Sequence, residues 1–120
     1  MIKITVDEAY AFDYYSILEL KYNNGYILKE YLEQTIQDLH NAIGIRLTNI
    51  VLESIEYQKL KNANLLTFEA VDKAKTDEVA ASYVDKCNYQ RMIAKKNLQA
   101  KFFNTKLSET KIGYDKHNIN

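Results

Sequence analysis

The chain has 120 residues, of which 16 are basic and 16 acidic, so no net charge draws it to nucleic acid or to a membrane surface. Its hydrophobic share of 47% and charged share of 27% are typical of one globular domain that buries its own core. One cysteine, Cys87, excludes an intramolecular disulfide, and no signal-peptide pattern opens the chain, so we expect a cytoplasmic protein.

Four helices are predicted, because the chain has no Pro, only three Gly, and apolar residues that recur every three or four positions. In chain order, the expected helices span 5–23, 26–43, 46–75 and 77–104. Thr5 and Glu8 form the pattern of a capping box at the start of the first helix. Thr76 precedes two acids at the start of the last helix. The third helix is the longest, with a bend expected at 62–64.

Short connections between long helices favour antiparallel neighbours. The expected fold is therefore all-α, an up-and-down helical bundle or long helical hairpin of about four helices. Residues 1–105 are expected to form this single domain. Residues 106–120 are polar and aperiodic, and we expect them to form a loosely ordered tail.

Two charged residues, Asp13 and Arg91, lie on the apolar stripes of the first and last helices. The first stripe consists of Val6, Tyr10, Asp13, Ile17 and Leu20. A buried charge is costly unless it is paired and hydrogen-bonded, so the favoured interpretation is a buried or half-buried ion pair that fixes how the two helices dock. In the alternative interpretation, Arg91 binds a phosphate or carboxylate together with Asn88 and Lys95 on nearby turns.

Four carboxylates, Glu53, Glu56, Glu69 and Asp72, have the spacing of the magnesium site in the all-helical, MazG-like nucleotide pyrophosphohydrolases. Hard cations such as Mg²⁺ bind several carboxylate oxygens. That site needs two acidic pairs on facing helices, whereas residues 57–68 between the pairs are predicted as one continuous helix. No metal site and no cofactor are therefore expected, and the metal-binding interpretation is the less favoured alternative.

Cations are frequent in the C-terminal part of the chain, namely Lys86, Arg91, Lys95, Lys96, Lys101, Lys106 and Lys111. A helix that binds phosphates carries its cations along one face, whereas these are scattered around the helix. Nucleic acid is therefore not the expected partner. The apolar segment 1–6 is too short to cross a membrane, and no membrane association is expected.

Tyrosine is concentrated near the N-terminus, where six of the ten Tyr lie between Tyr10 and Tyr31. Phe12, Tyr15 and Tyr22 occupy a face of the first helix different from its apolar stripe. Either this helix is central in the bundle and buried on several sides, or its aromatic residues form an outward patch for self-association or for a partner. In the second case Tyr15 and Tyr22 are the preferred anchors, with Phe12 as a further interface candidate.

Short motifs in this chain resemble those of an uncharacterised family of short, all-helical proteins from bacteria and phages. Residues 13–21, D-Y-Y-S-I-L-E-L-K, are similar to the family's D-K-I/L-T-I-L-E-I-K segment. Residues 60–68 are similar to its L-x-x-x-N-x-x-x-W segment. Residues 83–95 and 109–114 are similar to V-Y-x-x-N-D-x-R-x-x-x-K followed by E-x-K-x-Y.

Three positions depart from the family's motifs: Tyr14 stands in place of Lys, Phe68 in place of Trp, and Tyr89 in place of an acidic residue. The resemblance implies an all-helical fold and brings no activity with it. The favoured function is therefore a non-enzymatic interaction or assembly module that forms homo-oligomers and can bind a protein partner. Residues 1–60 hold five basic and nine acidic residues and 61–120 hold eleven and seven, which permits charge complementarity between chains. The alternative is a small Mg²⁺-dependent enzyme that acts on a phosphorylated substrate.

Overall fold

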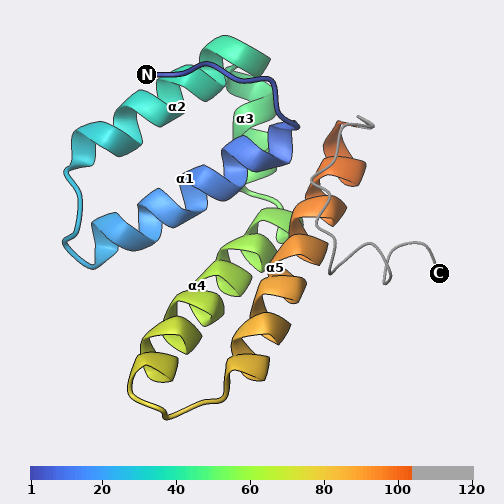
Figure 1. The fold of residues 1–120 in the computed structure, drawn as a ribbon. Helices are drawn as coiled ribbons and strands as arrows, with labels where there is room; N and C mark the ends of the chain where they lie inside the picture. Colours follow the sequence, from blue (N-terminus) through green and yellow to red (C-terminus); the bar gives the residue numbers. More distant parts are fainter. Residues whose placement is uncertain (104–120) are drawn as a thin grey trace.

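The computed structural model describes residues 1–103, and every regular element in that part is a helix (Figure 1). The elements are α1 (Glu8–Asn23), α2 (Lys29–Ile43), α3 (Ile45–Leu52), α4 (Ile55–Lys75) and α5 (Ala81–Phe102). α1 and α2 form one antiparallel pair, α4 and α5 form another, and the short α3 connects the two pairs (Figure 1). The predicted all-α class is confirmed. The predicted tail, 106–120, lies outside the described residues.

The predicted third helix, 46–75, consists of two helices, so the described part has five helices rather than about four. Ser54 lies at the break. Its Oγ accepts a hydrogen bond from the Tyr57 amide at 3.0 Å and donates one to the Val51 carbonyl at 2.6 Å. The hydroxyl of Ser54 thus hydrogen-bonds a carbonyl at the end of α3 and a free amide at the start of α4, which stabilises the break between the two helices. The interruption lies at Ser54 rather than at 62–64, where the bend was expected, and α4 is one continuous helix through 62–64.

The predicted capping box of Thr5 and Glu8 is wrong, because α1 begins at Glu8 and Thr5 is exposed before it. A side chain from α5 serves the start of α1 instead. Gln99 accepts a hydrogen bond from the Ala9 amide at 2.8 Å and donates one to the Glu8 carboxylate at 2.9 Å. A tertiary contact therefore satisfies the backbone donor that a local motif was expected to satisfy.

The predicted helix start at Thr76 is also wrong, because α5 begins at Ala81 and Thr76 follows the last residue of α4. The Thr76 hydroxyl donates a hydrogen bond to the Lys73 carbonyl at 3.1 Å. It thus satisfies an acceptor at the C-terminal end of one helix rather than a donor at the N-terminal end of the next.

Phe12 lies at the centre of the core, fully buried, with its ring 6.3 Å from that of Tyr57 and 6.2 Å from that of Phe103. Its predicted role at an interface is therefore wrong. The buried face of α1 includes Ala9 and Ser16 beside Phe12. The predicted stripe is buried at Asp13 and Leu20 and exposed only at Val6, so α1 is buried on more than one side.

Among residues 1–103, no helix combines the length and the apolar character that crossing a bilayer requires.

Candidate functional site

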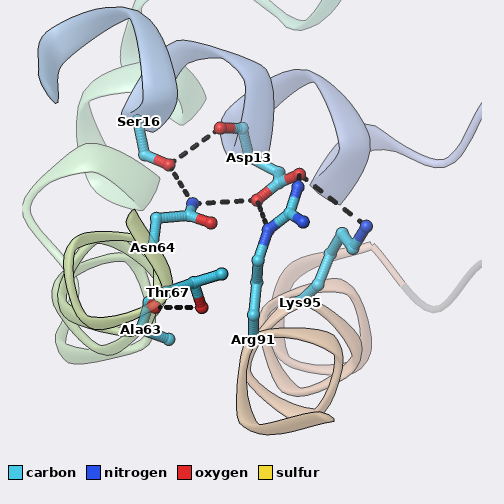
Figure 2. A network of polar contacts seen from close by, with 7 residues as sticks. All are labelled: Asp13, Ser16, Ala63, Asn64, Thr67, Arg91 and Lys95. Atoms are coloured by element: carbon cyan, nitrogen blue, oxygen red, sulfur yellow. Dashed lines mark hydrogen bonds and ion pairs between the residues drawn. The ribbon is translucent and has the colours of Figure 1, made fainter. Parts of the chain in front are cut away.

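A polar cluster joins α1 to both helices of the α4–α5 hairpin, with the carboxylate of Asp13 at its centre (Figure 2). Arg91 of α5 donates to it through two nitrogens, Nη2 to Oδ2 at 2.7 Å and Nε to Oδ1 at 3.3 Å. Asn64 of α4 donates from Nδ2 to Oδ1 at 2.9 Å. Asp13 is 4% exposed, so these charge-assisted hydrogen bonds replace the water that burial removes.

Two further side chains complete this cluster (Figure 2). Ser16 donates to the carbonyl oxygen of Asp13 at 2.8 Å and accepts a hydrogen bond from Asn64. Lys95 places its Nζ 3.7 Å from Oδ2 of Asp13 and 4.2 Å from the centre of the Tyr10 ring. The carboxylate therefore has one cation in direct bidentate contact and a second one slightly farther away.

Only some of the residues that the sequence predicted for this site belong to the cluster. Asp13, Arg91 and Lys95 come together, whereas Asn88 on the same helix as Arg91 contributes no hydrogen bond to the cluster. Sequence analysis missed Asn64 as a member. A signal was present, because Asn64 interrupts the apolar face of α4 in the way that Asp13 interrupts the face of α1.

The geometry assigns the Arg91 guanidinium to an internal carboxylate. Its Nε and Nη2 both donate to Asp13, and the Arg91 side chain is 26% exposed. Beside it lies a small cavity of about 160 Å³, whose lining includes Arg91, Asn64 and Phe68. An external phosphate or carboxylate at this edge of the guanidinium has to compete with Asp13, so the arrangement fits a structural ion pair better than an anion site.

The four carboxylates with metal-site spacing do not surround a common point. Glu53 follows the last residue of α3, and Glu56, Glu69 and Asp72 lie along α4. Glu56 and Glu69 are separated by about 20 Å along the helix axis at 1.5 Å per residue. Within the described residues, no three His, Cys, Asp or Glu side chains are grouped so that they could hold a metal ion.

A second, half-buried contact ties α1 to α4 through Glu19. Its carboxylate accepts a short hydrogen bond from the Tyr57 hydroxyl and one from Lys61 Nζ at 3.3 Å. Burial, reinforced by the hydrogen bond to Glu19 and by nearby negative charge, raises the pKa of the Tyr57 hydroxyl. Tyr57 therefore remains a hydrogen-bond donor throughout the physiological pH range.

A groove of about 530 Å³ lies between α4 and α5. The residues that line it are Lys59, Asn62, Ala63 and Leu66 of α4, and Tyr83, Lys86, Cys87, Gln90, Ile93, Ala94 and Asn97 of α5. The neighbouring Cys87 thiol raises the pKa of the Tyr83 hydroxyl. Cys87 is buried and is also part of the groove lining.

A second exposed surface lies where α1 turns into α2, and we call it the tyrosine corner. It consists of Tyr22, Tyr26, Leu28 and Tyr31, whose exposed fractions range from 39% to 66%. The Tyr26 ring lies 6.4 Å from that of Phe68 on α4. Of the predicted interface residues, Tyr22 belongs to this corner. Tyr15 instead packs partly against the core.

The chain matches no family model, no curated protein and no solved structure. Its function is therefore inferred from the geometry of these surfaces.

Proposed function

We propose that the protein is a non-enzymatic helical interaction module that self-associates through the tyrosine corner. The supporting observation is that four of the exposed large hydrophobic residues in the described part, Tyr22, Tyr26, Leu28 and Tyr31, lie within one ten-residue stretch. Contiguous apolar patches of a few hundred Å² on a monomer mark interaction surfaces. Four large, exposed side chains within ten consecutive residues are the basis for proposing such a surface here.

Tyrosine suits such a contact because its ring buries a large area while its hydroxyl keeps a hydrogen bond to water or to the partner. The charges beside the corner are mixed, with Lys21 and Lys29 against Glu30 and Glu33. A twofold interface brings the same patch of two chains together, so each patch must complement itself. Two cations and two acids at the edge of one patch allow opposite charges to meet across such an axis.

The test is the mass of the particle in solution, measured by light scattering coupled to size exclusion at concentrations up to several hundred micromolar. Wild-type protein is expected to exceed the mass of a single chain. The double variant Tyr26→Ser/Tyr31→Ser is expected to return to that mass with an unchanged far-ultraviolet circular dichroism spectrum, because both side chains are exposed. Tyr83→Ser is the matched control, since Tyr83 is similarly exposed but lies on α5 and is not one of the residues of the corner.

A wild-type protein that has the mass of one chain at the highest concentration contradicts the proposal. So does a Tyr83→Ser variant that dissociates as completely as the corner variant. Tyr15, the other predicted anchor, is unsuitable for this test because its contact with the core couples association to stability.

A further inference from the structure

We propose that the groove between α4 and α5 binds an amphipathic helix of a protein partner, whose apolar stripe is flanked by acidic residues. This surface is separate from the tyrosine corner and serves a different partner. The residues of the groove come from both helices of the hairpin, and the contact would add a third helix to that pair.

The groove lies on the face of the hairpin that points away from α1. Asn64 of α4 contacts α1 through Asp13 and Ser16. Residues two positions apart on a helix differ in direction by about 200°, so Asn62 and Leu66 point away from α1. Both of them line the groove. α1 therefore covers one face of the hairpin and leaves the groove on the other face accessible.

The shape of the groove fits a helix. On α5 its lining extends from Tyr83 to Asn97, about 21 Å at 1.5 Å per residue. The lining includes a small residue from each helix, Ala63 of α4 and Ala94 of α5, which leaves room for the backbone of a third helix. Leu66 and Ile93 provide apolar contacts for its side chains. An elongated groove with small residues in its lining is the surface that helix-in-groove recognition uses.

The charges of the groove select an acidic occupant. Lys59 on α4 and Lys86 on α5 line it, and no acidic residue among 1–103 does. Neither lysine forms an ion pair with a residue in the described part of the chain. A helix with glutamates or aspartates beside its apolar stripe gains two favourable contacts here, whereas a basic helix meets two like charges.

The same hairpin already binds an acidic helix on its other face, because α1 docks there through carboxylates. Asp13 meets Arg91 at 2.7 Å, and Glu19 meets Lys61 at 3.3 Å. One cation of α5 and one cation of α4 thus each form an ion pair with an acidic side chain of α1. Lys86 and Lys59 repeat this arrangement, one cation per helix, on the face that no helix of the described chain covers.

The positions of the two lysines set the spacing of the partner's acids. α4 and α5 are antiparallel, and both Lys59 and Lys86 lie in the first third of their own helix, so they flank opposite ends of the groove. Asn64 and Arg91 meet at Asp13, and each lysine lies five residues before one of them, so the offset of the two lysines along the groove is about ten residues of helix, or about 15 Å. A partner helix is therefore expected to carry two acids about ten positions apart, which lie about 80° apart around its axis and flank its apolar stripe.

The test uses a synthetic 18-residue helix of Ala, Leu and Gln, with a Leu stripe, two flanking Glu at this spacing and a fluorescein label. Fluorescence anisotropy is expected to show binding to the full-length protein, about tenfold tighter than that of the same peptide with Lys in place of Glu. The Lys59→Glu/Lys86→Glu variant is expected to reverse this preference. Lys73→Glu/Lys101→Glu is the matched control, with one exposed lysine on each helix outside the groove, and keeps the wild-type preference.

Cys87 reports directly on the groove, because it is the only cysteine of the chain and lines the groove. Saturating acidic peptide is expected to slow alkylation of Cys87 by N-ethylmaleimide at least tenfold. Equal binding of the acidic and basic peptides, or alkylation that the acidic peptide leaves unchanged, overturns the proposal. Alkylation that slows with protein concentration alone also overturns it, since a second copy then occupies the groove.

These measurements can contradict the proposed self-association and the proposed peptide groove independently of each other. The Tyr26→Ser/Tyr31→Ser variant is expected to bind the acidic peptide with wild-type affinity, because neither residue lines the groove. A monomeric wild-type protein that still binds the peptide contradicts only the self-association. An oligomer that binds no peptide contradicts only the assignment of the groove.

Discussion

Replacing Arg91 with Ala is expected to destabilise the protein by about 2–3 kcal/mol, an intermediate value that follows from its geometry. Isolating a fully buried carboxylate costs about 3–5 kcal/mol, and breaking a solvent-exposed pair costs less than about 1 kcal/mol. The Asp13 side chain is 6% exposed, which favours the first value, but its carboxylate keeps Asn64 at 2.9 Å and Lys95 at 3.7 Å. The half-exposed space left by Arg91 also admits water, which lowers the cost further.

Urea unfolding at pH 7, followed by far-ultraviolet circular dichroism, measures this cost. Arg46→Ala is the matched control, since Arg46 is exposed on α3, and its effect is expected to stay within about 0.5 kcal/mol. Lys95→Met keeps the side-chain stem and loses only the longer ion pair, so it is expected to cost less than Arg91→Ala. In a double-mutant cycle with Asp13→Asn, a coupling energy of at least about 1.5 kcal/mol is expected.

An effect of Arg91→Ala within 1 kcal/mol of the Arg46→Ala control would refute the role of the ion pair in docking α1. A coupling energy near zero would refute it even if Arg91→Ala were costly, because the loss would then come from the packing of the long side chain alone.

Two further predictions concern the backbone and the pH dependence of stability. Burial and the charge of Glu8 raise the pKa of Asp7 above its ordinary value of 3.8, so its favourable contribution is complete below that pH and is lost as the pH rises through the folded-state pKa. The stability of wild type relative to Asp7→Asn is therefore expected to fall between pH 4 and 7 in urea titrations, and a constant difference would contradict this. Gly44 has φ of 91° and ψ of 156°, a region that only glycine adopts readily, and a Cβ there meets no atom within 4 Å. Gly44→Ala is expected to cost about 1–3 kcal/mol through backbone strain alone in the same titrations, and an effect below 0.5 kcal/mol would contradict it.

The helical class and the members of the ion pair were predictable from the sequence, because both follow from local rules. Apolar periodicity indicates a helix wherever it persists, and a charge on an apolar stripe needs a partner. Asp13 and Arg91 are opposite charges in this position, and the structure places them 2.7 Å apart. The same rule applied to Asn64 would have added the amide that completes the cluster.

The helix ends were harder to predict because their partners come from elsewhere in the chain. Gln99 lies 90 residues from the Ala9 amide that it satisfies, and no local motif announces such a contact. Likewise, periodicity cannot decide which of two adjacent apolar faces is buried. On α1 both faces are buried, since Asp13 and Leu20 of the stripe and Phe12 of the aromatic face all lie inside the structure. Of the two interpretations left open for the aromatic face, Phe12 therefore follows the one in which the helix is buried on several sides.

A helix with apolar residues on several sides buries them against several neighbours. In the described part of the chain, α4 and α5 have apolar residues on a side that no other helix contacts. α4 turns Leu60 toward the core, where it is fully buried, and Leu66 toward the groove, where it is exposed. Ile93 of α5 also lines the groove, so each helix offers it an apolar side chain. α1 covers one face of the pair by combining apolar packing with carboxylates that meet the hairpin's cations. The groove presents a similar combination of apolar residues with two lysines that form no ion pair within residues 1–103, which is the physical reason to expect a second acidic helix there.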